Sequence, residues 1–175
     1  MFSGKFGLNL HGSKRVMQAL WLRRVFVIKR TPEQDLIDGF VNRLKRAKNP
    51  LFRASEVINS SCKSKKYADI EYISENGTKW AIEAKSHDSS DRHNTVHKLF
   101  GELLKETGRE NRDGFLFGLL IPTESLNFYS RLLQSINRDK FIGFGNLVPI
   151  SAVFLYGNSS IKQLTWESLY DAYKP

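Results

Sequence analysis

The sequence predicts an α/β domain built on a central mixed β-sheet flanked by helices. Segments with apolar residues at helical spacing alternate along the chain with shorter segments rich in β-forming residues. Two of the latter, 114–121 and 149–157, are nearly continuous apolar runs, as is typical of strands that helices cover on both faces. The predicted order is helix, three strands, helix, strand, helix, strand. Such mixing favours one sheet with helices around it.

The first clear helix is expected to begin at the start of "TPEQ". Thr31 is a typical N-cap, Pro32 is favoured at the first helical position, and Gln34 completes a capping box. An apolar stripe at helical spacing follows, and a basic polar segment ends the helix. Residues 51–58 then predict a short extended segment, and residues 59–66 a polar basic loop.

Two strands between residues 67 and 86 are joined by a turn whose length decides which side chains meet. A two-residue turn would put Asp69 and Glu83 on opposite faces of the sheet, because a slip of one residue reverses every side chain. A three-residue loop would pair the two acids directly and would place Gly77 at the left-handed last position, which glycine adopts without strain. The turn therefore permits Asp69, Glu83 and Lys85 to converge but does not require it.

The rest of the chain continues the alternation. Residues 95–107 predict a strongly amphipathic helix that Gly108 ends. The remaining elements are strand 114–121, a helix marked by Leu126, Tyr129, Leu133 and Ile136, strand 149–157, and a short terminal helix within 165–174.

Charge is distributed unevenly along the 175 residues. The net charge is +9, but residues 1–66 carry 15 of the 27 basic residues and only 4 of the 18 acidic ones. A basic half joined to a nearly neutral half favours a polyanionic partner, most simply nucleic acid. We interpret residues 1–30 as a basic N-terminal extension packed on the core and residues 31–175 as the single domain.

Cysteine content and hydropathy indicate the compartment. The lone Cys62 excludes an internal disulfide and provides no thiolate zinc site, which favours a reducing compartment, so we expect a cytoplasmic protein. No apolar run approaches the roughly 18 residues of a membrane span, and no membrane partner is expected.

Asp69, followed on the next strand by Glu83-Ala84-Lys85, resembles the PD-(D/E)xK motif of the restriction-endonuclease-like nuclease superfamily. The resemblance covers residues 31–121, whose element order matches the αβββαβ core of that superfamily. One departure is Ala68, which precedes Asp69 where the eponymous pattern has proline.

The resemblance implies a metal-dependent phosphodiesterase. Asp69, Glu83 and the Ala84 carbonyl are the implied ligands of Mg²⁺, for which Mn²⁺ can substitute, because hard cations prefer oxygen ligands. Lys85 is implied to orient or deprotonate the attacking water and to stabilise developing negative charge. Glu33, in the first turn of the first helix, matches a glutamate that many members add to the metal site. Its alternative role is that of a capping residue favoured by the helix dipole.

Other polar residues have weaker assignments. Lys63, Lys65 and Lys66 precede the Asp69 strand and are expected to contact backbone phosphate, although a solvated loop explains them equally well. His93 and His97 have a spacing that can hold zinc, but exposed or phosphate-contacting histidines explain them better.

The sequence therefore predicts a Mg²⁺-dependent nuclease, with DNA favoured over RNA as the substrate. A homodimer or a partner subunit is compatible with the resemblance, since many such nucleases cut both strands as dimers. Three alternatives stay open: an RNA-directed nuclease such as a tRNA-cleaving toxin, a non-catalytic nucleic-acid-binding module on the same fold, and a solvated strand face on which Glu83 and Lys85 are merely exposed.

Overall fold

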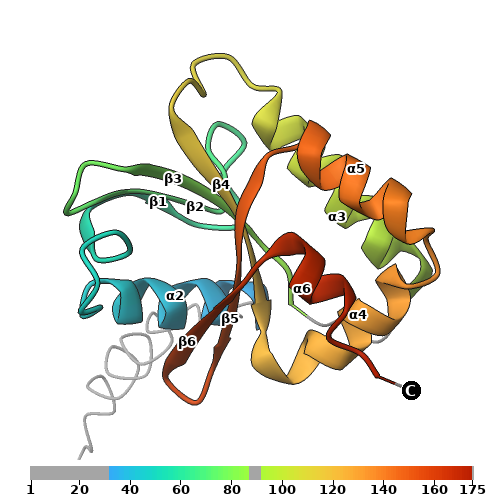
Figure 1. Ribbon diagram of the computed structural model, residues 1–175. Helices are drawn as coiled ribbons and strands as arrows, with labels where there is room; N and C mark the ends of the chain where they lie inside the picture. Colours follow the sequence, from blue (N-terminus) through green and yellow to red (C-terminus); the bar gives the residue numbers. More distant parts are fainter. Residues whose placement is uncertain (1–31, 87–91, 175) are drawn as a thin grey trace, which may run out of the picture.

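A six-stranded sheet in the order β1-β2-β3-β4-β5-β6 forms the centre of the protein (Figure 1). The computed structural model describes residues 32–86 and 92–174. The α/β class with a mixed sheet flanked by helices is confirmed. The elements are α2 (Pro32–Leu44), β1 (Ala54–Ser60), β2 (Ile70–Ser74), β3 (Lys79–Ala84), α3 (Arg92–Thr107), β4 (Phe115–Pro122), the short 3-10 helix η2 (Thr123–Ser125), α4 (Leu126–Leu133), α5 (Arg138–Leu147), β5 (Ile150–Gly157), β6 (Ser160–Leu164) and α6 (Trp166–Tyr170).

Strand direction changes along the sheet. The pairs β1–β2 and β2–β3 are antiparallel, β3–β4 and β4–β5 are parallel, and β5–β6 is antiparallel. The two apolar runs of the sequence are β4 and β5, which lie next to each other inside the sheet. Helix α5 and strand β6 were not expected from the sequence, and α3 begins three residues earlier than predicted.

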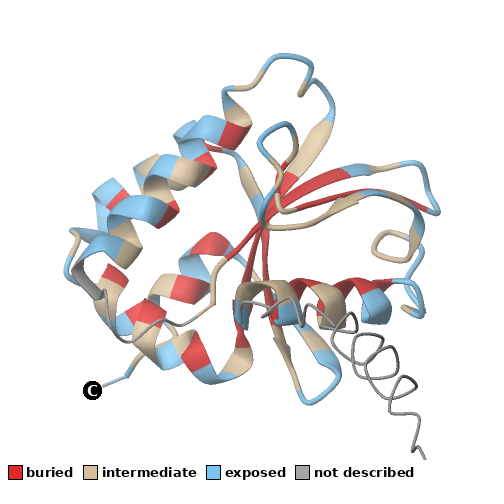
Figure 2. Ribbon diagram, turned by 180° about the vertical axis from the view of Figure 1, so that it is seen from behind, coloured by how far each residue is buried: buried red, intermediate tan, exposed pale blue. Residues whose placement is uncertain are grey.

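Helices cover the two faces of the sheet unequally. On one face, α2 packs its apolar stripe against β2, β3 and β5, around the large side chains of Trp80, Tyr72 and Phe154. On the other face, α3, α4, α5 and α6 enclose a second core with β4 and β5. The buried residues are concentrated in the central strands and on the helix sides that face them (Figure 2).

The β2–β3 hairpin has the register that brings the two acids together. Ile70 pairs with Ile82 and Ile73 with Lys79, so the loop contains three residues. Ser74 donates its N–H to the Thr78 carbonyl at 2.9 Å, and Gly77 has φ 81°, the left-handed conformation expected of it. The three-residue alternative is confirmed.

Helix α2 begins at Pro32, as predicted. The proposed cap Thr31 and the basic extension 1–30 lie outside the described residues. The Gln34 side chain donates to the Ser60 carbonyl at 2.9 Å and accepts the Cys62 N–H at 3.3 Å, which fastens the start of α2 to the end of β1. Within the described part of the chain, no helix has the length and apolarity needed to cross a membrane.

Candidate active site

Three residues of the motif converge beside a polar cavity of about 130 Å³. Asp69 directly precedes β2, Glu83 lies in β3, and Lys85 is the first residue after β3. Ile82 and Ala84, on either side of Glu83 in the strand, face α2. Side chains alternate along a strand, so Glu83 lies on the opposite face of the sheet, which α3 covers. The cavity is lined by Glu33, Cys62, Ser64, Tyr67, Asp69, Glu83, Lys85, Glu102, Lys105, Glu106 and Arg109.

Asp69 and Glu83 form a pair of carboxyl groups in which Glu83 is buried and Asp69 is half-buried. The Ala84 N–H donates to Asp69 Oδ2 at 3.0 Å, and Glu83 hydrogen-bonds to Asp69. Burial, reinforced by the charges of Asp69 and Glu106, raises the pKa of Glu83 to about 9. Burial also raises the pKa of Asp69, although the Ala84 N–H and Lys85 oppose that shift. Near neutral pH one proton is therefore retained between these two acids.

Lys85 is held between two further glutamates. Its Nζ lies 2.5 Å from Glu102 Oε2 and 3.7 Å from Glu33 Oε2, and only 12% of the side chain is exposed. Burial alone would lower the pKa of Lys85, but the charges of Glu33 and Glu102 outweigh it and raise the pKa. Lys85 is therefore a buried ammonium group throughout the neutral pH range.

Glu33 reaches the site from the first turn of α2, as the sequence predicted. Its carboxylate also accepts the backbone N–H of Ser86, just beyond Lys85. Burial raises the pKa of Glu33, with Lys85 opposing the shift. A capping contact to Thr31 falls outside the described residues.

Sequence reasoning missed two acids on α3. Glu102 pairs with Lys85, and Glu106, which is 3% exposed, raises the pKa of Glu83 through its charge. Both acids border the apolar stripe of the predicted helix. Glu102 adjoins Leu103, and Glu106 lies three residues after Leu103. An acid bordering an apolar stripe was the available signal.

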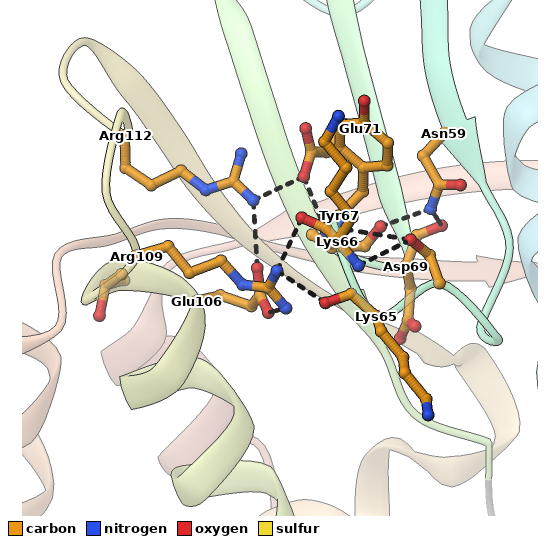
Figure 3. A network of polar contacts seen from close by, with 12 residues as sticks. Asn59, Lys65, Lys66, Tyr67, Asp69, Glu71, Glu106, Arg109 and Arg112 are labelled. Atoms are coloured by element: carbon orange, nitrogen blue, oxygen red, sulfur yellow. Dashed lines mark hydrogen bonds and ion pairs between the residues drawn. The ribbon is translucent and has the colours of Figure 1, made fainter.

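A buried ionic network lies next to the cavity (Figure 3). Arg112 Nη2 contacts Glu71 Oε1 at 2.6 Å and Glu106 Oε2 at 3.2 Å, and Arg109 Nη2 pairs with the second oxygen of Glu106. Glu71 on β2 and Glu106 on α3 are almost fully buried, so the two arginines supply the positive charge that their carboxylates need.

The same network fastens the basic loop to the end of α3. Arg109 Nη1 donates to the Lys65 and Lys66 carbonyls at 3.2 and 2.7 Å, and Glu71 accepts the Ala68 N–H at 2.7 Å. The side chains of Lys63, Lys65 and Lys66 are exposed. They adjoin Ser64 and Tyr67, which line the cavity, so the backbone of loop 63–66 borders the cavity.

Asp69 and Glu83 are the candidate ligands for a divalent cation. Asp69 and Glu83 supply hard carboxylate oxygens whose pKa values burial raises, and a cation between them would stabilise their charged forms. Within residues 32–86 and 92–174, no three His, Cys, Asp or Glu side chains are arranged to hold a metal. Two acids therefore fit a cation only if backbone or water oxygens complete the coordination.

The histidines were expected to be exposed or to contact phosphate, and not to bind zinc. His97 is exposed, while His87 and the His93 side chain lie outside the described structure.

No protein-family model, no curated protein and no solved structure matches this chain.

Proposed function

We propose that the protein is a Mg²⁺-dependent nuclease, with DNA as the favoured substrate. The observation that carries the proposal is the pair of Asp69 and Glu83 with the Lys85 ammonium group beside the same cavity. Hydrolysis of a phosphodiester needs these parts: oxygen ligands for a hard cation and a fixed positive charge near the attacked phosphate. The order α2, β1, β2, β3, α3, β4 supports assignment to the restriction-endonuclease-like core.

Asp69 and Glu83 would hold the cation, together with the Ala84 carbonyl. A bound Mg²⁺ would neutralise phosphate charge and acidify its water. The Ala84 N–H holds Asp69 Oδ2 from the same strand that carries Glu83, which fixes one of the two acids relative to that strand. Losing the shared proton makes both carboxylates available as ligands.

Lys85 would stabilise negative charge and orient the attacking water. Its raised pKa disfavours the base role, because a lysine that stays protonated cannot accept a proton from water. Glu33 and Glu102 hold the ammonium group in position and are positioning residues in this proposal.

The proposal predicts that cleavage depends on Glu83 and Lys85. The purified chain is incubated with plasmid DNA, single-stranded DNA and total RNA, each with Mg²⁺ or EDTA. Glu83→Gln and Lys85→Met should each lower the Mg²⁺-dependent rate by at least about a hundredfold, since each removes a group that acts on developing charge. Lys79→Met, at the exposed start of β3, is the matched control and should cleave like the parent chain.

Circular dichroism spectra establish that the variants are folded. Cleavage that persists in both Glu83→Gln and Lys85→Met would overturn the proposal, as would the absence of Mg²⁺-dependent cleavage of all three substrates. Cleavage of RNA alone would replace DNA by RNA as the substrate.

A further inference from the structure

A second, larger cavity adjoins the candidate active site. Its volume is about 700 Å³, within the roughly 300–1,000 Å³ typical of ligand sites. Pro32 and Ser86 line it, and their chain neighbours Glu33 and Lys85 line the first cavity. The two cavities therefore lie on either side of the start of α2 and the end of β3.

The far wall of this second cavity is rigidly built. The Tyr156 ring on β5 lies against α2 at Gly39, where an added Cβ would stand only 2.6 Å from Tyr156 Cε1. Asn158 and Ser159 have φ values of 48° and 56° and form the two-residue turn between β5 and β6. The cavity is lined by Tyr156 and Asn158 but not by Ser159.

A buried hydroxyl group in the lining has no protein partner. Ser125 is 2% exposed, and its Oγ makes no hydrogen bond within the described part of the chain. It occupies the N-cap position of α4, yet its side chain accepts no backbone N–H there. Leaving a buried hydroxyl unpaired is unfavourable, so a ligand that reached Ser125 Oγ would gain by pairing with it.

The lining has a composition that suits a flat, neutral group with polar edges. Tyr156 and the prolines Pro32 and Pro122 supply apolar surfaces, while Ser125, Asn158 and Glu124 supply hydrogen-bonding groups. Among the described lining residues there is no lysine or arginine, so these residues offer no cation to a phosphate group.

We propose that this cavity binds a nucleobase of the nucleic-acid strand whose backbone lies at the Asp69–Glu83 pair. The inference rests on the proposed nuclease function and adds a base-reading subsite to it. Tyr156 provides an aromatic ring for the base, because stacking suits any base. Asn158, Glu124 and Ser125 would supply hydrogen-bonding groups to its polar edge, and such contacts discriminate between bases.

The test compares base preferences at the cut. The full chain cleaves single-stranded DNA of random sequence in Mg²⁺, and sequencing of the fragment ends gives the base frequencies at each position. We expect one position near the cut to show a preference of about tenfold between the best and worst base, since a well-placed pair of hydrogen bonds discriminates by that much. The double variant Ser125→Ala/Asn158→Gly should reduce that preference to about twofold or less.

The variants are chosen to keep the fold. Removing the unpaired Ser125 hydroxyl breaks no hydrogen bond within the described structure, and glycine is suited to the left-handed conformation of Asn158. Ser159→Gly, the neighbouring left-handed residue outside the lining, is the control and should retain the preference. Because the preference is a ratio within one reaction, it does not depend on the overall rate.

A second measurement separates failure of the subsite from failure of the nuclease proposal. Saturation-transfer NMR with adenosine, guanosine, cytidine and thymidine needs no cleavage. Transfer to base protons that the double variant abolishes would support the subsite even in a chain that cuts nothing. Three results would each overturn the base-reading subsite: uniform base frequencies at the cut, a base preference that the double variant leaves unchanged, or no saturation transfer to any of the four nucleosides.

Discussion

The raised pKa of Glu83 predicts that the metal-free protein becomes less stable as pH rises. In the folded protein the carboxyl keeps its proton up to a pKa of about 9, against an ordinary value of 4.5. Folding therefore binds a proton between these two pH values, and the stability that this proton contributes is complete below 4.5 and lost as pH rises through 9. Glu83→Gln, which is neutral at every pH, should lack this dependence.

The magnitude follows from the size of the shift. One pKa unit corresponds to about 1.4 kcal/mol, so the full shift is at most about 6 kcal/mol. Between pH 6 and 8 the free energy of unfolding should fall by about 1.4 kcal/mol per pH unit from this group, or about 3 kcal/mol in all. Glu83 is only 7% exposed, so solvent screens its charge little and the pH dependence of stability is not much weakened.

Urea denaturation in EDTA at pH 6, 7 and 8 measures the effect. Groups that lie away from this site contribute alike to the parent chain and to Glu83→Gln, so the difference between the two slopes isolates the contribution of Glu83. Glu110→Gln, an exposed substitution, should keep the parent slope. Adding Ca²⁺ at pH 8 should stabilise the parent chain and have less effect on Glu83→Gln, because a bound cation favours the charged carboxylate.

Parallel slopes for the parent chain and Glu83→Gln would refute the reasoning. They would mean that Glu83 is already ionised at neutral pH in the folded protein, as expected if water reaches the carboxyl pair freely. The solvated-face alternative for β3 would then regain its support.

Two further predictions concern the surroundings of the site. Arg112→Ala should lower the free energy of unfolding, measured by urea titration, by about 3–5 kcal/mol, because it removes the cation from two buried carboxylates. The control Arg46→Ala, at an exposed position, should change that free energy by less than about 0.5 kcal/mol. Equal effects of the two substitutions would contradict the prediction. Replacing the three lysines of loop 63–66 by glutamine should reduce the log–log salt slope of duplex binding, measured in Ca²⁺, by up to about three. An unchanged slope would make that loop a solvated segment. The matched control replaces Lys140, Lys162 and Lys174.

The central hairpin was predictable because its determinants are local. Gly77 at a positive φ suits both a two-residue and a three-residue loop, so the sequence predicts the hairpin but leaves its register open; the structure has the three-residue loop, which pairs Asp69 with Glu83. Local determinants also explain α2, whose start is set by Pro32 and whose buried face follows from helical spacing.

Two elements escaped prediction because tertiary packing, not local preference, explains their residues. Helix α5 contains Gly143 and Gly145, which lower helix propensity. A Cβ at Gly145 would lie 2.3 Å from Trp166 Cδ1, so glycine there makes room for the indole ring. Strand β6 is a largely exposed edge strand that follows a turn without the usual Asn-Gly or Asp-Gly pair.

The ionic network escaped for a different reason. Glu71 and Arg112 are 41 positions apart, and no periodicity in the sequence connects them. Alternation placed Glu71 on the same face as Asp69, but it could not distinguish a solvated acid from one buried beneath α3. Only the packed position of Arg112 makes that burial tolerable.

The position of Asp69 shows how the surrounding strands prepare the site. Its carbonyl accepts the Ser61 N–H at 2.8 Å and the Asn59 amide at 3.2 Å, both from the β1 side. Its carboxylate accepts the Ala84 N–H from β3 on the other side. Because backbone and side chain are anchored to different neighbours, Asp69 can neither turn away nor shift without breaking hydrogen bonds. In the proposed nuclease a cation would meet one preformed ligand, Asp69, and would have to displace the proton held by Glu83, which would make cation binding depend on pH.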